Sequence, residues 1–309
     1  MYESFYGLKQ KPFSMLPDPG FLYLSKKHET ALVLLEYGLM NHAGFCVISG
    51  EIGAGKTTLM RKLLAKVEDN VTVGMITNTH QSFGELIDWV LSAFGIHRPG
   101  LNKVEMHQLL VDFLLEQYAK NRTSLLIVDE AQNMSTDALE ELRMISNVNS
   151  EKDLVLQVIL AGQPALKDNL RVPELRQFAQ RISVDYHLDA LNQIESCGYI
   201  QHRLVTAGAT RDIFTPHACA RIHAYSGGIP RLINLLADTT LIYAYADQRE
   251  IVDADLVDEV ARERMKNSVV PLRDIEDVSD SPETELTDFP WIAPEGGTSG
   301  LKPAVEKKK

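Results

Sequence analysis

The sequence has few cysteines, no long uninterrupted hydrophobic run and no recognisable secretory signal. Its three cysteines, Cys46, Cys197 and Cys219, are far apart and odd in number, so no metal-binding or redox spacing connects them. This usage favours structural thiols in a reducing compartment. The longest apolar stretch, 232–246, is interrupted by Asp238 and is shorter than the about 20 residues that a membrane-spanning helix needs. The N-terminus lacks a basic region followed by an apolar one. We therefore expect a cytoplasmic protein.

Basic residues are also fewer than acidic ones. Lysine and arginine number 31 against 42 aspartate and glutamate residues, which gives a formal net charge of −11. Such a balance repels nucleic acid and anionic membranes on average, although a local basic patch is still compatible with it, because binding depends on the local field. The chain has 309 residues and is 45% hydrophobic, so it can build a sizeable core, and its length suggests about two domains.

The first two thirds of the chain alternate between strand and helix patterns after an N-terminal segment rich in aromatic residues and proline. Alternation of this kind predicts an α/β fold with a mostly parallel sheet covered on both faces, whose ligands bind at the carboxyl ends of the strands. The predicted strands are 45–49, 71–77, 124–128, 154–161 and 182–186, and the predicted helices are 28–40, 57–67, 82–94, 104–118 and 135–145 with Ser135 as the N-cap of the last.

Strand patterns stop at about residue 188. Thr215 followed by Pro216 is typical of a helix start, and Asp253 is a second candidate cap. We predict helices over 189–207, 216–225, 230–246 and 253–266. The expected domains are a core with the N-terminal segment over 1–187, a small all-helical lid over 188–267, and a disordered acidic and polar tail over 268–309.

The strongest motif is the stretch from Gly50 to Thr57, which matches the Walker A pattern of P-loop proteins between a predicted strand and a predicted helix. Glycines let backbone N–H groups wrap phosphates, and the start of the helix favours anions. We expect Lys56 to reach the β- and γ-phosphates of ATP and Thr57 to bind Mg²⁺. The candidate nucleotide-binding residues are Gly50, Glu51, Ile52, Gly53, Ala54, Gly55, Lys56, Thr57 and Thr58.

A second motif follows the buried strand 124–128. Asp129 and Glu130 stand at its carboxyl end, about seventy residues after the first motif. Asp129 is the candidate for the Mg²⁺ shell. Glu130 is the candidate general base that polarises the attacking water, so the two motifs together predict hydrolysis of ATP.

Further polar residues occupy places where they could act on the same chemistry. Gln163 follows the next strand and is a candidate for contact with the γ-phosphate or the water, with a plain loop amide as the alternative. Asn78 ends the strand 71–77 and is a candidate partner that holds Glu130 away from water until a partner binds, with an ordinary polar residue at a strand end as the alternative. An arginine finger from a neighbouring subunit is expected at Arg176 or Arg181, with Arg181 preferred. Arg231, at the start of a helix of the second domain, is expected near the nucleotide.

Taken together, these residues resemble those of the AAA+ ATPases: Walker A at 50–57, Walker B at 125–130, a polar sensor at Gln163, a finger at Arg181 and a sensor arginine at Arg231. Within that superfamily, the chain looks like the ExeA/GspA-type secretion ATPases. The segments that carry this likeness are Phe5-Tyr6-Gly7-Leu8, Lys11-Pro12-Phe13, Pro17-Asp18-Pro19, Phe21-Leu22-Tyr23-Leu24-Ser25, Asp129-Glu130-Ala131-Gln132 and Phe178-Ala179-Gln180-Arg181-Ile182.

The resemblance implies a homo-oligomer, as a ring or helix, that uses ATP and Mg²⁺ to serve envelope assembly, secretion or polysaccharide export. It also implies an unidentified protein client, with membrane-associated machinery and the periphery of the inner membrane as its setting. The same module is similar to transposition regulators of the TniB/TnsC kind, so a DNA-associated ATPase is the alternative. The net charge of −11 favours the first hypothesis.

Overall fold

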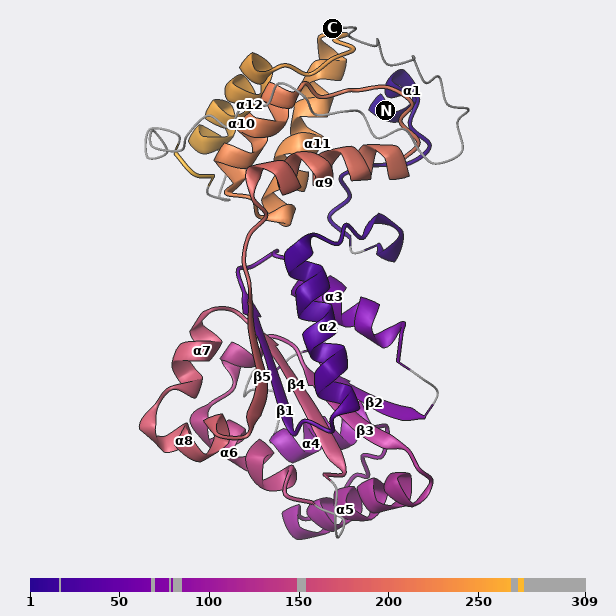
Figure 1. Ribbon diagram of the computed structural model, residues 1–309, viewed down its shortest axis with the longest axis vertical. Coiled ribbons are helices and arrows are strands. Elements are labelled where there is room, and N and C mark those ends of the chain that lie inside the picture. The colour runs from indigo at the N-terminus through magenta and orange to yellow at the C-terminus, as the bar shows by residue number, and fades with distance from the viewer. Residues whose placement is uncertain are drawn as a thin grey trace, which may run out of the picture. The chain divides into compact units, whose positions relative to one another are not determined.

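The computed structural model describes residues 1–16, 18–67, 70–77, 79, 85–148, 154–267 and 272–274. These residues divide into two compact units (Figure 1). The core unit consists of Pro17–Leu191 with Ile229–Arg231. The helical unit consists of Met1–Leu16, Asn192–Gly228 and the described part of Leu232–Lys309. The sequence predicts a core over 1–187 that includes the first sixteen residues, whereas the contacts group residues 1–16 with helices of the second unit.

A five-stranded parallel sheet forms the centre of the core unit, with the strand order β2-β3-β4-β1-β5. Val47 of β1 lies opposite Leu160 of β4 and Asp185 of β5, and Val128 of β3 also lies opposite Leu160. All five strands therefore end at one edge, as the sequence predicted for an α/β fold. The strands are β1 (Phe45–Gly50), β2 (Val71–Ile76), β3 (Thr123–Val128), β4 (Leu156–Gly162) and β5 (Ile182–Leu188).

Successive side chains of a strand point to opposite faces of the sheet, and the strands carry hydrophobic residues on both faces. Helices therefore cover both faces. One face packs Cys46 and Ile48 against α2 and α3, and the other packs Phe45 and Val47 against the remaining helices of the unit. The helices are α2 (Lys26–Met40), α3 (Lys56–Leu64), α4 (Leu86–Ala93), α5 (Lys103–Ala119), α6 (Thr136–Ile145), α7 (Ala165–Leu170) and α8 (Arg176–Ala179), with short 3-10 turns η1 (Pro19–Phe21), η3 (Ala131–Asn133) and η4 (Pro173–Leu175).

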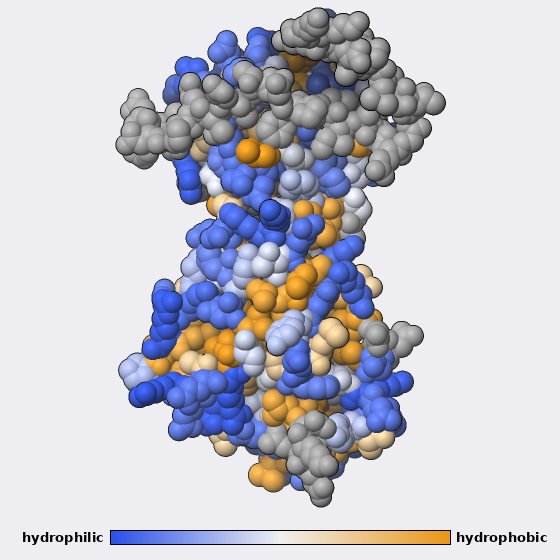
Figure 2. Space-filling view, in the orientation of Figure 1, coloured by the Kyte–Doolittle hydropathy of each residue, from blue (hydrophilic) through white to orange (hydrophobic). Residues whose placement is uncertain are grey.

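Helix α2 also keeps hydrophobic side chains on its outer side. Val33, Tyr37 and Met40 stand four and three residues apart, so they share one side of the helix, and all three are exposed. Figure 2 shows hydrophobic residues on the surface of the core unit in the region where Figure 1 draws α2. The helix is thus apolar both where it packs on the sheet and along a strip of its outer surface.

The helical unit contains α1 (Tyr2–Tyr6), α9 (Gln193–Thr206), α10 (Pro216–Ser226), α11 (Pro230–Ala246) from its third residue on, and α12 (Ala254–Asn267). The predicted caps are present: the side chain of Thr215 accepts from Ala218 N–H, and Asp253 accepts from Leu256 N–H at 3.0 Å. The helix predicted from residue 189 begins at Gln193, where Asn192 forms a capping box with Glu195.

The N-terminal segment is fixed to the helical unit by hydrogen bonds that the sequence did not predict. The Tyr2 hydroxyl donates to Oδ1 of Asp238 at 2.5 Å, and the Lys11 ammonium lies 3.0 Å from Oδ2 of the same carboxylate. Arg203 donates to the carbonyl of Pro12 at 2.5 Å. Burial raises the pKa of the Tyr6 phenol to about 12, and this hydroxyl donates to the carbonyl of Arg249. These contacts explain why residues 1–16 group with helices from the other end of the chain.

Candidate functional site

The loop between β1 and α3 contains the Walker A residues and is shaped by two glycines. Gly53 and Gly55 have φ angles of 83° and 103°, a region that residues with a side chain rarely adopt. A Cβ atom at Gly55 would lie 3.0 Å from Nε2 of His28, so space is limited there as well. The loop leads straight into α3, whose first turn offers unpaired backbone N–H groups to an anion.

Lys56, the first residue of α3, turns its side chain back into this loop. Its ammonium donates to the carbonyl oxygens of Gly50 at 2.7 Å and of Glu51 at 3.0 Å, and the residue is only 7% exposed. Burial lowers the pKa of Lys56 from its usual value, while the carboxylates of Glu130, Asp129 and Glu51 act in the opposite direction. The three carboxylates therefore help to keep a positive charge inside the loop.

The next residue, Thr57, connects α3 to the end of β3. Its hydroxyl donates to Oδ2 of Asp129 at 2.8 Å, and Oδ1 of Asp129 accepts the backbone N–H of Glu130 at 3.0 Å. A hydroxyl and a buried carboxylate in contact are hard oxygen donors of the kind that Mg²⁺ prefers, with phosphate oxygens and water completing its shell. In the described ranges, no group of three or more His, Cys, Asp or Glu residues could hold a metal ion.

Glu130 directly follows Asp129 and adopts a left-handed backbone, with φ of 53°. Its carbonyl accepts the hydroxyl of Thr79 at 2.9 Å. Its carboxylate oxygen Oε2 accepts the side-chain amide of Gln132 at 2.6 Å, with the amide of Gln163 farther off at 3.5 Å. The unusual backbone and the two amides together set the direction of this carboxylate.

The strand order explains why these residues meet. Strand β4 lies between β1, which leads into the Walker A loop, and β3, which leads into Asp129 and Glu130. Gln163 follows β4 directly, so it stands between the two motifs at the same edge of the sheet. The chain leaves β1 toward one side of the sheet and β4 toward the other, which is the kind of position where α/β sheets bind ligands.

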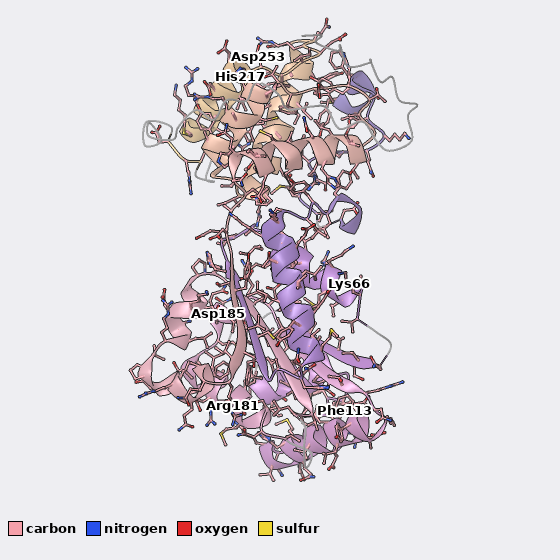
Figure 3. All side chains as sticks on the ribbon, viewed as in Figure 1. Lys66, Phe113, Arg181, Asp185, His217 and Asp253 are labelled. Atoms are coloured by element: carbon pink, nitrogen blue, oxygen red, sulfur yellow. The ribbon has the colours of Figure 1, made fainter. Side chains whose placement is uncertain are left out.

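Two predicted residues lie elsewhere in the core unit. Arg181 precedes β5, and the first residue of β5, Ile182, lies opposite Phe45, whereas Gly50 lies opposite Leu188. Arg181 is therefore at the strand-start edge, far from the Walker A loop of its own chain, and its guanidinium lies 3.4 Å from the carbonyl of Arg143 and from Oγ of Ser146 (Figure 3). Arg176, the other candidate finger, is exposed on α8.

Arg231 is grouped with the core unit, and its backbone N–H lies 3.4 Å from the carbonyl of Gly53. A Cβ atom at Gly53 would lie 2.4 Å from Cβ of Arg231, so glycine is needed at this point of the loop.

Ile52 is exposed and Thr58 is half-buried in α3. Asn78, the candidate partner of Glu130, lies outside the described residues.

Two residues that shape the site, His28 and Gln132, are not predicted from the sequence. His28, in the first turn of α2, is buried; its Nε2 lies 3.1 Å from the carbonyl of Ala54, and its Nδ1 lies 2.8 Å from Oγ of Ser25. Gln132 was part of the family resemblance but had no role assigned to it. A serine three residues before a histidine at a helix start was a visible signal, but nothing in the sequence indicated that this helix begins beside the loop.

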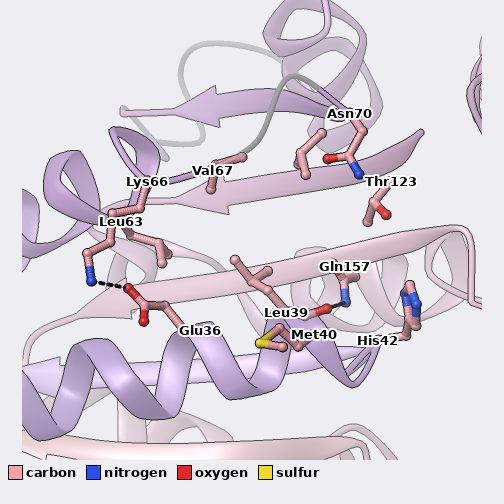
Figure 4. Close-up of a pocket in the computed structure, with 11 residues that line it drawn as sticks. Glu36, Leu39, Met40, His42, Leu63, Lys66, Val67, Asn70, Thr123 and Gln157 are labelled. Atoms are coloured by element: carbon pink, nitrogen blue, oxygen red, sulfur yellow. Dashed lines mark hydrogen bonds and ion pairs between the residues drawn. The ribbon is translucent and has the colours of Figure 1, made fainter. Parts of the chain in front are cut away.

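A separate hollow of about 440 Å³ lies between α2, α3 and the sheet (Figure 4). Leu39, Leu63 and Thr123 are among its lining residues, and Lys66 forms an ion pair with Glu36 at 2.6 Å beside it. Val71 and Thr123 also line it, and these are the first residues of β2 and β3. The hollow therefore lies at the strand-start edge, opposite the edge that carries the Walker A loop.

The sheet order, the loop between β1 and α3 and the acidic residues after β3 define an AAA-type P-loop nucleotide-binding protein. The sequence profile of a family described as AAA domain matches residues 39–170. General secretion pathway protein A of Aeromonas hydrophila is 40% identical over 258 residues, which are 83% of this chain and 47% of that protein. The chain therefore belongs to the family of general secretion pathway protein A and contains an AAA domain. These two matches confirm the resemblance predicted from the sequence. It spans about half the length of this curated relative.

Solved structures support the same fold. The ORC2 protein of Aeropyrum pernix, in ADPNP–ADP complexes, has a TM-score of 0.61 at 20% identity, over 82% of this chain and 72% of that one. The ORC1 protein of Aeropyrum pernix, in complex with DNA, has a TM-score of 0.59 at 18% identity, over 84% and 70% of the two chains. At these identities the likeness concerns the fold alone. Within the residues that the structure describes, no helix is long and apolar enough to cross a membrane.

Proposed function

We propose that this chain binds ATP with Mg²⁺ at 50–57 and hydrolyses it. The observation that carries the proposal is the meeting of Lys56, the Thr57–Asp129 pair and Glu130 where β1, β3 and β4 end. A cation, a pair of hard oxygen donors and a carboxylate base are the groups that phosphoryl transfer to water requires.

The reaction follows from these placements. The backbone N–H groups of the loop and of the first turn of α3 bind the phosphate oxygens, and Lys56 exchanges its two carbonyl partners for the β- and γ-phosphates. Glu130 takes a proton from the attacking water as its oxygen bonds to the γ-phosphorus and the bond from that phosphorus to the β-γ bridging oxygen breaks. ADP and inorganic phosphate are the products. Thr57 and Asp129 would hold Mg²⁺, which would supply positive charge to the phosphate oxygens when bound.

We further propose that the active form is an oligomer in which Arg181 completes the site of a neighbouring subunit. Arg181 stands at the opposite edge of the sheet from the Walker A loop of its own chain, so it cannot reach the phosphates there. In a head-to-tail assembly, that edge of one copy can face the loop of the next, and the guanidinium can then neutralise charge that develops in the transition state. This arrangement would make hydrolysis depend on assembly.

The similarity to general secretion pathway protein A supports a role in secretion or envelope assembly, with an unidentified protein client. The test starts with the purified chain: nucleotide affinity by calorimetry and phosphate release with and without Mg²⁺. The proposal requires micromolar to millimolar ATP binding and Mg²⁺-dependent turnover. Binding that Lys56→Ala leaves intact would remove the assignment of the loop.

Binding to duplex DNA separates this proposal from the DNA-associated alternative. The chain is incubated with ATP and a random-sequence duplex at low and high salt. Weak binding at both salt concentrations is expected from the net charge of −11. Tight binding that falls steeply as salt rises would favour the DNA-associated ATPase instead.

A further inference from the structure

The side chain of Gln132 bridges two elements that end at the candidate site. Its Nε2 donates to Oε2 of Glu130 at 2.6 Å, and its Oε1 accepts the backbone N–H of Gln163 at 2.9 Å. The direction of the amide follows from its partners, since a backbone N–H can only donate and must therefore face the oxygen. The amide nitrogen is then left to face the carboxylate of Glu130.

The surroundings of Gln132 hold it in this place. The side chain of Asn169, in α7, donates to the carbonyl of Gln132 at 3.1 Å. Gly162, the last residue of β4, leaves room for the amide: a Cβ atom there would lie 2.9 Å from Oε1 of Gln132 and 2.9 Å from Cδ2 of Leu166. The bridge thus depends on backbone and side chains from β4 and α7 as well as on Gln132 itself.

Both amides that reach Glu130 bind the same oxygen. Gln132, at 2.6 Å, and Gln163, at 3.5 Å, both approach Oε2 of Glu130, so the described amides hold this carboxylate through one of its two oxygens. A base that is fixed through one oxygen presents the other in a constant direction. Such positioning lowers the free-energy barrier to hydrolysis, because less conformational entropy is lost on the way to the transition state.

We propose that Gln132 is a positioning residue that links the end of β4 to the general base. Any displacement of Gln163 by the terminal phosphate is passed through the backbone N–H of Gln163 to the amide of Gln132 and so to Glu130. The inference rests on the proposed role of Glu130 in hydrolysis. Gln132 itself touches Glu130 and Gln163, and acts on the reaction only through them.

The test compares variants that remove the amide but keep the volume of the side chain. Gln132→Leu and Gln132→Met are measured for kcat, for KM and for ATP affinity at equilibrium. We expect kcat to fall about tenfold or more while the Kd for ATP stays within about twofold, since only the orientation of the base is lost. Gln157→Met is the matched control: this glutamine is also buried, on β4, but its amide donates to the carbonyl of Leu39 far from Glu130, so kcat should not change.

A double substitution separates an effect through Glu130 from a general loss of structure. In a Glu130→Gln background, Gln132→Met should cause no further loss of kcat, because the residue it orients is already gone. Three outcomes would overturn the inference: unchanged kcat in both Gln132 variants, increased kcat, or a full additional loss in the Glu130→Gln background. Gln132→Met is the second variant if Gln132→Leu unfolds, as checked by thermal melts. A Glu130→Gln protein with wild-type kcat would instead refute the proposed function itself.

Discussion

The hydroxyl of Thr57 donates a hydrogen bond of 2.8 Å to the carboxylate of Asp129, which connects the first turn of α3 with the end of β3. The two residues are 72 positions apart in the chain, so only the fold brings them together. Their contact places two hard oxygen donors beside the ammonium of Lys56, and their proposed common role is to hold Mg²⁺ with the phosphates.

Removal of the carboxylate should therefore change the metal requirement of hydrolysis. We expect Asp129→Ala to raise the Mg²⁺ concentration for half-maximal turnover about tenfold or more, and EDTA to abolish turnover of the unsubstituted chain. Phosphate release measured across a magnesium titration checks both results. Asp137→Ala, in the first turn of α6, is the control for loss of one negative charge and should leave the titration unchanged. An unaltered titration in Asp129→Ala would place the metal elsewhere.

Gly55 should be intolerant of a side chain for two reasons that can be separated. Its φ of 103° strains any other residue, and a Cβ would lie 3.0 Å from Nε2 of His28. We expect Gly55→Ala to lower ATP affinity about tenfold or more and to destabilise the chain by about 1–3 kcal/mol. Calorimetric binding and denaturant melts measure the two effects.

Gly95 provides the matched control for this substitution. Its φ is 71°, but among the residues that the structure describes no atom beyond its chain neighbours lies within 4 Å of the position of a Cβ. Gly95→Ala should thus carry the strain of a positive φ and lower stability, yet leave ATP affinity unchanged. If both variants bound ATP equally well, the shape of the loop at Gly55 would not determine phosphate binding.

Action of Arg181 on a neighbouring site predicts complementation between two inactive proteins. Arg181→Ala keeps Glu130 but lacks the finger, and Glu130→Gln keeps the finger but lacks the base. In an equal mixture, about one junction in four pairs an intact base with an intact finger, so activity should reappear on mixing. Phosphate release at a fixed total protein concentration measures it, with each variant alone as reference.

The same experiment distinguishes the two candidate fingers. Arg176→Ala removes an exposed arginine of α8 and should hydrolyse ATP at the normal rate without any partner. Absence of recovery in the Arg181→Ala and Glu130→Gln mixture, in proteins that still assemble, would count against action in trans.

Much of the core could be read from the sequence because its signals are local. The residues 50–57 contain the signals for a turn and a helix start within eight positions, and Asp129 and Glu130 follow a short buried strand. The bounds of each strand were predicted to within a few residues for the same reason. A short run of hydrophobic and β-branched residues bounded by polar ones is typical of a buried strand.

Contacts between segments that are far apart in the sequence could not be predicted from these local patterns. The place of β4 between β1 and β3 decides that Gln163 and Gln132 meet Glu130, and strand order has no local signature. His28 reaches the Walker A loop only because α2 begins beside it. The N-terminal segment was predicted to accompany the core that follows it directly, but its tyrosines and Lys11 find their partners on α11 and on the residues that follow it.

The attachment of this N-terminal segment gives the last prediction. The Tyr2 ring is 2% exposed and its hydroxyl donates to Asp238, whose other oxygen pairs with Lys11. Tyr2→Phe removes the donor and keeps the ring, and should destabilise the chain by about 1–3 kcal/mol, because the partner is charged. Asp238→Ala should cost more, since it leaves the buried hydroxyl of Tyr2 without its acceptor as well as Lys11 without its partner. Thermal and urea melts followed by circular dichroism measure the loss, and Tyr37→Phe, at a tyrosine 62% exposed on α2, should leave the melts unchanged. Equal stability of Tyr2→Phe and Tyr37→Phe would mean that the aromatic rings alone hold the N-terminal segment in the helical unit.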